Sequence, residues 1–477
     1  MHHPLIGRQE EQGILQRALD SKEAEMVALI GRRRVGKTFL IKSFFKDKIA
    51  FEITGIQNAP QEEQLQNFTQ QLNRAAQNTL PLPRPNNWLE AFHLLTLFLE
   101  KKDKKEKLVL FFDELPWLAA QRSSFLRAFG NFWNSWAVNQ SIVVVICGSA
   151  ASWMIQKVVH NTGGLYNRIT RRIFLQAFTL SEVENYLQSR QIYLDRYQIV
   201  QLYMALGGIP HHLKEIEANK SAVQNINRIC FSPNGLLRDE FDQLYPALFA
   251  NADNHLKVIR TLAQKRQGIS REELIRISRL PNGGGLTKVL EELSQSGFIQ
   301  ILPAFGKKKK GQIYRLTDEY SLFYLRFIEG SAYEGDNTWL LLSQTQSNKI
   351  WSGYAFENIC LKHVAQLKKA LGISGIYSNS SSFYQQGTKE ESGAQIDLLI
   401  DRNDHVINVY EIKLYQEPFS ISKDYAANLR NKIGTFRQAS RTKKHLIPTL
   451  ISPFGLKANS HSRSLNIQVL TLDALFD

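Results

Sequence analysis

The residues with the clearest chemical purpose form the pattern Gly31-x-x-x-x-Gly36-Lys37-Thr38. Glycines at both ends allow the backbone to wrap so that its N–H groups point inward, and a helix that begins there adds partial positive charge. A lysine in this place neutralises the outer phosphates of a nucleoside triphosphate, and the threonine hydroxyl can bind Mg²⁺. The pattern predicts a phosphate-binding loop, and a glycine-rich turn that matches by chance is the weaker explanation.

Adjacent carboxylates, Asp113 and Glu114, supply the second half of such a site. They follow an apolar run, residues 108–112, that is typical of a buried strand. Asp113 can hold Mg²⁺ through water, and Glu114 can orient and deprotonate an attacking water. The pair predicts hydrolysis of the nucleotide as well as binding, whereas the alternative is a surface acidic pair after a strand.

Two further apolar runs must position these groups. Residues 25–30 predict a strand that leads into the glycine pattern, and a helix is expected from residue 39. Residues 141–149 predict another strand, which ends at Ser149 and, in a parallel sheet, would lie beside the γ-phosphate. Ser149 is therefore a candidate sensor of the phosphate, or else a turn serine that caps the next helix. We expect an α/β fold with a parallel sheet and nucleotide contacts from Gly31, Arg34, Val35, Gly36, Lys37, Thr38, Phe39 and Ser149.

Two short segments outside these strands carry a resemblance. The first is Gly7-Arg8-x-x-Glu11, and the second is the Gly-x-Pro turn of residues 208–210. With the glycine pattern and the two polar strand ends, they make this half of the chain resemble the archaeal-type ATPase family, a prokaryotic branch of the AAA+/STAND-like P-loop ATPases. The resemblance implies that Gly7 and Arg8 lie over the nucleotide base, that Pro210 belongs to a lid near the adenine, and that the ligand is ATP with Mg²⁺.

Relatives in that family carry a basic residue that reads the γ-phosphate where this chain has residues 164–168. The resemblance implies this catalytic role for Arg168, with Arg171 and Arg172 as competitors. A basic turn that faces solvent is the alternative.

The middle of the chain predicts a lid and a small second fold. Residues 180–250 have amphipathic helical spacing, and residues 251–328 predict three helices and two strands joined by a segment that contains Lys307 to Lys310. This order predicts a winged helix, which in DNA-binding versions places its third helix in the major groove and its wing on phosphate. Use for protein contacts alone stays open, because Glu291 and Glu292 on the third helix repel phosphate.

A third set of chemical groups lies near the C-terminus. Glu357 falls on an early helix, Asp397 opens an apolar strand, and the next strand ends in Glu411-x-Lys413. Alternate strand residues share a face, so Asp397 and Glu411 can hold one divalent metal while Lys413 supports the nucleophile. The set resembles the PD-(D/E)XK nuclease module, which implies an α/β restriction-endonuclease-like domain with these four residues catalytic. Gln395 stands where relatives often carry another acid, and a degenerate fold kept for binding is the alternative.

The composition restricts the class of protein and its expected partners. The 477 residues carry a formal charge of +15, which favours an anionic partner such as DNA, although a solvated basic surface is the alternative. Three distant cysteines favour a reducing compartment and no zinc site. The N-terminus has no apolar signal region, and no run approaches the roughly 18 apolar residues of a membrane helix, so we expect a cytoplasmic protein without a membrane partner.

We therefore expect four domains: an ATPase domain (1–178), a helical lid (179–250), a winged helix (251–328) and a nuclease-like domain (329–477). The leading hypothesis is an ATPase that couples its nucleotide state to DNA binding and metal-dependent cleavage. The alternatives are a STAND-like switch that binds a partner without cutting, and a motor-like ring of identical copies.

Overall fold

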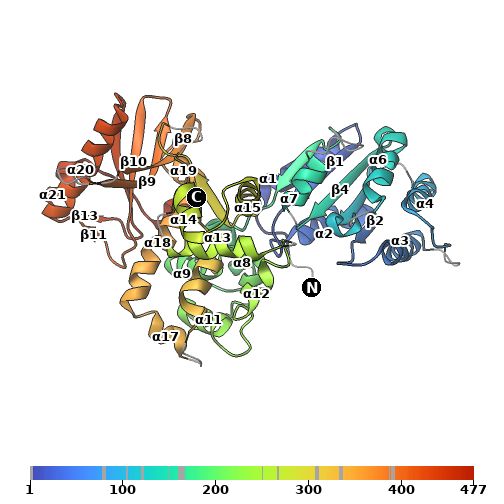
Figure 1. Ribbon diagram of the computed structural model, residues 1–477, viewed down its shortest axis with the longest axis horizontal. Helices are drawn as coiled ribbons and strands as arrows, with labels where there is room; N and C mark the ends of the chain where they lie inside the picture. The colour runs from blue at the N-terminus through green and yellow to red at the C-terminus, as the bar shows by residue number, and fades with distance from the viewer. Residues whose placement is uncertain are drawn as a thin grey trace. The chain divides into compact units, whose positions relative to one another are not determined.

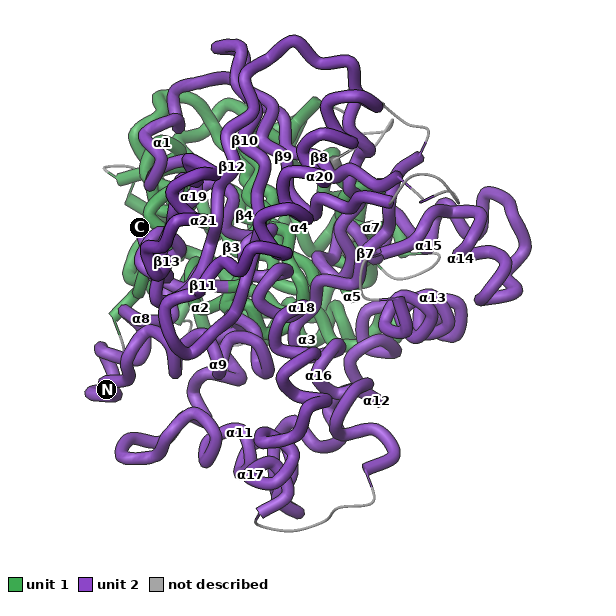
Figure 2. The backbone as a smooth tube through the Cα atoms, turned by 90° about the vertical axis from the view of Figure 1, so that its left-hand side faces the viewer, with its two compact units in different colours: residues 1–177 green, residues 178–477 purple. Residues whose placement is uncertain are grey.

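The structure is a computed structural model, and it divides into two compact units, residues 1–177 (the first unit) and 178–477 (the second unit) (Figure 2). No helix among the described residues is long and apolar enough to cross a membrane. The division into four domains stays a prediction. The structure describes residues 4–77, 82–103, 106–119, 123–149, 151–159, 167–249, 251–265, 268–306, 311–331, 337–385, 387 and 393–477.

The first unit is built on a five-stranded sheet in which every pairing is parallel, in the order β2-β3-β4-β1-β5 (Figure 1). All residues of β1 and β4 are buried, as expected where helices cover both faces of a parallel sheet. The expectation of an α/β fold with a parallel sheet is confirmed. The strands are β1 (Glu25–Ile30), β2 (Ile49–Thr54), β3 (Leu108–Asp113), β4 (Ile142–Gly148) and β5 (Arg171–Phe174).

Aromatic rings hold the helices of this unit against one face of the sheet. Phe112 of β3 packs against Phe92 and Phe129, with ring centroids 6.1 and 5.3 Å apart. Asn87 accepts the Glu90 backbone N–H at 3.0 Å, which caps the helix that carries Phe92. The helices are α1 (Gln9–Asp20), α2 (Lys37–Phe45), α3 (Gln61–Ala76), α4 (Trp88–Glu100), α5 (Leu115–Leu118), α6 (Phe125–Ser135) and α7 (Ala151–Met154).

The second unit begins with helices α8 (Leu180–Ser189), α9 (Arg196–Leu206), α10 (Pro210–Leu213), α11 (Ala222–Cys230) and α12 (Glu240–Leu244). The glycine pair before α10 has a packing reason inside this unit. Gly207 has a φ of 66°, and a Cβ on Gly208 would lie 2.0 Å from the carbonyl oxygen of Phe178. Only a residue without a side chain allows this approach. The glycine pair therefore lets Phe178, just before α8, pack against the end of α9.

Three helices and a hairpin follow, namely α13 (Asp253–Gln264), α14 (Arg271–Ser278), α15 (Gly284–Gln295), β6 (Ile299–Leu302) and β7 (Ile313–Leu316). The two strands pair antiparallel, and Ile269 forms a bridge with Tyr314 of β7. These elements agree with the sequence expectation, but their identity as a winged helix stays a prediction. Lys307 to Lys310 lie outside the described residues.

The last part of the chain forms a mixed sheet in the order β14-β12-β10-β9-β8 (Figure 1). β9 runs antiparallel to β8 and β10, whereas β10, β12 and β14 run parallel. The strands are β8 (Ser378–Gln385), β9 (Ala394–Arg402), β10 (Val406–Ile412), β11 (Phe419–Ser420), β12 (His445–Ile451), β13 (Leu456–Lys457) and β14 (Gln468–Leu470). The helices are α16 (Glu319–Phe323), α17 (Thr338–Leu342), α18 (Gln346–Lys362), α19 (Val364–Ala370), α20 (Lys423–Ser440) and α21 (Ser460–Leu465).

Candidate functional site

The glycine pattern of the first unit forms the turn between β1 and α2. Gly36 has a φ of 94° and directly precedes α2, and a Cβ on Gly31 would lie 2.6 Å from the Leu175 carbonyl oxygen. Both positions therefore require glycine, one for its backbone angle and one for close packing. The turn ends at a helix N-terminus, where free backbone N–H groups attract anions.

Lys37 is buried, with 6% of its side chain exposed. Its Nζ donates to the carbonyl oxygens of Gly31 and Arg32, both at 2.9 Å, and to Ser149 Oγ at 3.0 Å. All three partners are neutral groups, so they hold the ammonium in place without cancelling its charge. The arrangement leaves a full positive charge at the mouth of the turn for an anionic ligand.

Thr38 and Asp113 meet across the sheet edge. Thr38 Oγ1 donates to Asp113 Oδ2 at 2.6 Å, and the Glu114 backbone N–H donates to Asp113 Oδ1 at 3.0 Å. A hydroxyl and a carboxylate are hard oxygen donors, which Mg²⁺ prefers. The residues present at this position therefore fit a magnesium ion, and their role as its ligands stays a prediction.

Glu114 and Ser149 form the other half of the contact network. The Ser149 backbone N–H donates to Glu114 Oε2 at 3.1 Å, and the Ser149 hydroxyl donates to Glu114 Oε1. Glu114 has a φ of 47°, a left-handed conformation that costs a non-glycine residue about 1 kcal/mol. Ser149 thus joins the candidate base to Lys37, which makes the end of β4 the link between the two.

The N-terminal segment is tied to the same turn. Arg8 is buried, and its Nη2 donates to the Val35 carbonyl oxygen at 3.3 Å. Gly7 and Arg8 both have positive φ, 63° and 58°, so the chain makes a tight turn before α1. Val35 is buried, and Arg34 has a φ of 70°, whereas Phe39 is 46% exposed on α2.

Three predicted positions are not brought to this turn by contacts within the first unit. Arg168 is exposed and precedes β5, whose Arg171 pairs with Glu25 at 2.8 Å. Glu25 begins β1, whereas the glycine turn follows the end of β1, roughly 16 Å away along the strand. Arg168 and Arg171 therefore lie toward the edge of the sheet where the strands start. Pro210 opens α10 and belongs to the second unit.

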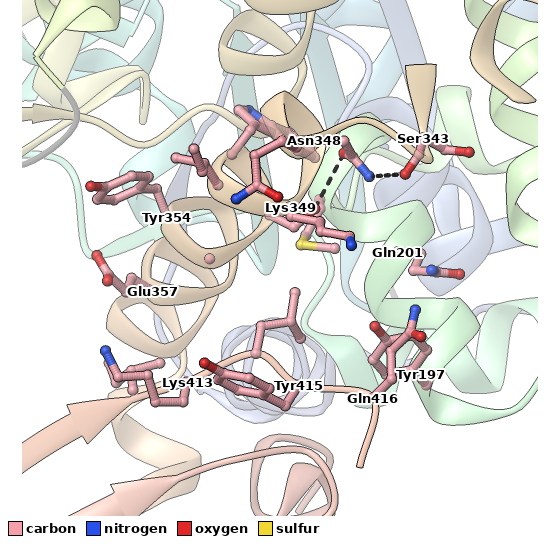
Figure 3. Close-up of a pocket in the computed structure, with 18 of the residues that line it drawn as sticks. Tyr197, Gln201, Ser343, Asn348, Lys349, Tyr354, Glu357, Lys413, Tyr415 and Gln416 are labelled. Carbon is pink, nitrogen blue, oxygen red and sulfur yellow. Dashed lines mark hydrogen bonds between the residues drawn. The ribbon is translucent and has the colours of Figure 1, made fainter. Parts of the chain in front are cut away.

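The second unit brings the four C-terminal candidates together. Glu357 of α18, Asp397 of β9, and Glu411 and Lys413 at the end of β10 all line one cavity of about 1050 Å³. Figure 3 shows Glu357 and Lys413 at one side of this cavity, with Tyr197 of α9 at the other. The expectation that these residues share one site agrees with the structure, although their chemical role stays a prediction.

Two of the carboxylates share an arginine that sequence reasoning missed. Arg315 of β7 lies with its Nη2 3.1 Å from Glu357 Oε2 and its Nη1 3.9 Å from Asp397 Oδ1. Gln395, noted above as a departure from the family pattern, donates to Asp397 Oδ1 at 2.9 Å. Burial and the charge of Asp397 raise the pKa of Glu357 to about 7, although Arg315 opposes the shift. The sequence signal that could have identified Arg315 is a charged residue between Tyr314 and Leu316 in a short strand.

Glu411 is held by two cations and a phenol. Lys413 Nζ and Lys432 Nζ of α20 each lie 3.0 Å from one of its carboxylate oxygens, and Tyr425 donates to it at 2.6 Å. Burial alone would raise the pKa of Glu411, but the two lysines lower it overall. Lys432 lies 21 residues from Glu411, and its role had no local sequence pattern.

A metal at Asp397 and Glu411, which stays a prediction, would have to compete with cations that already contact these carboxylates. Each of the three C-terminal carboxylates already has a cationic partner. Divalent ions need carboxylate oxygens that are free to coordinate. The sequence pattern indicated which residues meet, but not that cations already bind them.

Residues 5–216 match a family described as an ATPase domain predominantly from Archaea. An uncharacterised protein of Methanocaldococcus jannaschii is 22% identical over 415 residues, which cover 86% of this chain and 87% of that protein. An uncharacterised ATP-binding protein of the same organism is 46% identical over 43 residues, 9% of this chain and 73% of that protein. A Walker-type ATPase of Pyrococcus abyssi has a similar fold, with a TM-score of 0.50 and 18% identity over 68% of this chain and 96% of that chain. Residues 5–216 therefore form an ATPase domain of this predominantly archaeal family.

Proposed function

We propose that the first unit binds and hydrolyses ATP with Mg²⁺. The single observation that carries the proposal is the continuous contact network from Lys37 through Ser149 to Glu114, beside the Thr38–Asp113 pair. It combines a buried cation, a hydroxyl–carboxylate pair suited to Mg²⁺ and a carboxylate base at one sheet edge.

The residues divide the work of hydrolysis. Lys37 neutralises the outer phosphates, and Thr38 with Asp113 would hold Mg²⁺, which neutralises further phosphate charge when bound. Glu114 is held by Ser149 in the present structure. A phosphate that competes for Lys37 and the Ser149 hydroxyl would release Glu114, which can then accept the proton of the attacking water.

Hydrolysis of ATP by the purified chain tests this proposal. Lys37→Ala is expected to reduce the rate by about a hundredfold or more, because it removes charge stabilisation of the transferred phosphate. Lys42→Ala is the matched control: it removes a lysine of the same helix that pairs with Glu52 at the surface. Equal rates for wild type and Lys37→Ala would reject the proposal.

For the second unit we propose nucleic-acid binding, through α13–α15 and the β6–β7 hairpin as a winged helix, and cleavage at the C-terminal carboxylates. The formal charge of +15 and the convergence of Glu357, Asp397, Glu411 and Lys413 on one cavity support this proposal. Incubation with DNA, Mg²⁺ or Mn²⁺, and ATP tests it. Absence of cut products, or cutting that survives Lys413→Ala, would reject cleavage.

A second candidate function is a cytoplasmic, ATP-dependent switch that binds a partner without cutting. The observation that favours it is the pairing of the C-terminal carboxylates with Arg315, Lys413 and Lys432. A shift of DNA mobility that needs no metal and leaves no products would support the switch. The molecular mass in solution, with and without ATP, tests whether either version assembles into a ring of identical copies.

A further inference from the structure

Arg315 is buried, with 2% of its surface accessible, and it contacts two carboxylates that line the C-terminal cavity. It lies on β7, whereas its two acidic partners lie on α18 and β9. Three segments that are far apart in the sequence therefore meet at one guanidinium. Its Nε atom is also buried, and no hydrogen-bond partner is found for it among the described residues.

The guanidinium lies beside one oxygen of each of two carboxylates that a metal could use. Its Nη2 and Nη1 lie 3.1 and 3.9 Å from oxygens of Glu357 and Asp397. Arginine stays charged at every relevant pH, so this positive charge cannot be removed by losing a proton. A Mg²⁺ ion binds carboxylates at about 2.1 Å and would have to lie within a few ångströms of the guanidinium. Repulsion between the two cations is strong in a partly buried site, so they compete for the same carboxylates.

We propose that Arg315 is an internal counter-ion that replaces a divalent cation between Glu357 and Asp397 and keeps the C-terminal site free of metal. The inference rests on the proposed nuclease-like site and adds its regulation. Because β7 belongs to the hairpin that we propose binds nucleic acid, a displacement of that hairpin would withdraw the guanidinium and open the carboxylates to a metal.

Arg315 controls the site more directly than the lysines do. Glu411 keeps Lys413 and Tyr425 as partners when Lys432 is removed. Removal of Arg315, in contrast, takes away the cation that Glu357 and Asp397 share, and two adjacent carboxyl groups without that cation can bind a divalent ion in place of protons.

The proposal is tested by measuring the affinity of the full chain for Mn²⁺ with titration calorimetry, in the absence of nucleotide. All proteins carry Thr38→Ala and Asp113→Asn, so that the first unit contributes no metal site. We expect the Arg315→Gln variant to bind Mn²⁺ at least about tenfold more tightly than the chain that keeps Arg315. Arg315→Lys, which retains the charge, is the matched control and should not gain affinity. Adding Glu357→Gln to Arg315→Gln should abolish the gain.

Equal affinity with and without Arg315 would overturn the proposal, as would a gain that survives Glu357→Gln. If Arg315→Gln loses its circular-dichroism spectrum, Arg315→Met replaces it, because methionine keeps the apolar stem. Tight Mn²⁺ binding by the chain that keeps Arg315, lost in Glu357→Gln, would overturn the proposal without any Arg315 variant.

Metal binding and DNA cleavage separate this inference from the proposed function. A gain of Mn²⁺ affinity in Arg315→Gln without cleavage supports the counter-ion and rejects the nuclease. Cleavage by wild type with no change of metal affinity in Arg315→Gln supports the nuclease and rejects the counter-ion.

Discussion

Both units contain a strand that ends in carboxylates, but different groups hold those carboxylates. In the first unit, Asp113 and Glu114 accept hydrogen bonds from the hydroxyls of Thr38 and Ser149. In the second unit, the acids at the cavity contact full cations, among them Arg315 with Glu357. Hydroxyls leave the carboxylate charge in place, whereas cations cancel it. The carboxylates of the first site therefore keep their charge for the Mg²⁺ that we propose, whereas those of the second site already have cationic partners.

The strongest way to test this contrast is to remove one carboxylate charge in the first unit. Glu114→Gln keeps the shape of the side chain but removes its ability to accept a proton. We expect hydrolysis to fall by about 10² to 10⁴-fold, with ATP still bound, because a positioned general base contributes an effect of that size. Single-turnover hydrolysis and fluorescent-nucleotide binding measure the two effects. Loss of binding together with hydrolysis would indicate that Glu114 holds the fold of the turn instead.

For the free energy of unfolding, in contrast, we expect the larger effect from a carboxylate of the second unit. Glu357→Ala leaves the buried Arg315 without its nearest partner, which we expect to lower the free energy of unfolding by about 3 kcal/mol. Asp113→Asn is the matched change in the first unit, and it should cost about 1 kcal/mol or less because its partner is a hydroxyl. Urea unfolding followed by fluorescence measures both. Similar losses in the two variants would contradict the contrast.

Sequence spacing predicted which residues of the first unit meet, because they are close in the chain or share a sheet edge. Gly36, Lys37 and Thr38 are consecutive, and parallel strands bring Asp113 and Ser149 to the same edge. Arg168 shows the limit: it was matched to a family position, but β5 runs parallel to β1 and places it near the opposite edge.

At the second site, the sequence predicted the acidic residues but not most of the cations that contact them. Glu357, Asp397 and Glu411 were found from strand alternation and resemblance, and they line one cavity. Their cations come from other segments: Arg315 lies 42 residues before Glu357, on a hairpin assigned to another fold. Which long side chain reaches a buried acid depends on tertiary packing, which local periodicity does not encode.

The stability of the two units should also depend differently on pH below neutrality. His363 is buried in the second unit, where its Nε2 accepts the Leu180 backbone N–H at 3.0 Å and its Nδ1 donates to the Ile359 carbonyl oxygen at 2.8 Å. Burial lowers its pKa to about 4. A histidine whose pKa falls on folding stabilises the protein above its unfolded pKa of about 6.5 and loses that contribution as the pH falls toward 4.

We therefore expect the second unit to lose about 1 to 3 kcal/mol between pH 6.5 and 4 from this residue. His93, the histidine of the first unit that the structure describes, is exposed. Unfolding free energies across this pH range, for wild type and for His363→Gln, measure the effect. Glutamine can donate and accept the same two hydrogen bonds without titrating, so an unchanged pH slope in this variant would contradict the assignment.

The smallest expected effect distinguishes Lys432 from Arg315 among the three cations of the second site. Lys432→Ala removes one partner of Glu411 but leaves Lys413 at 3.0 Å and Tyr425 at 2.6 Å. A carboxylate that keeps two partners is not left uncompensated, so we expect a loss of about 1 kcal/mol or less. Urea unfolding beside Glu357→Ala measures the difference. A loss as large as that of Glu357→Ala would make Lys432, and not Arg315, the cation on which the charge balance of this site depends.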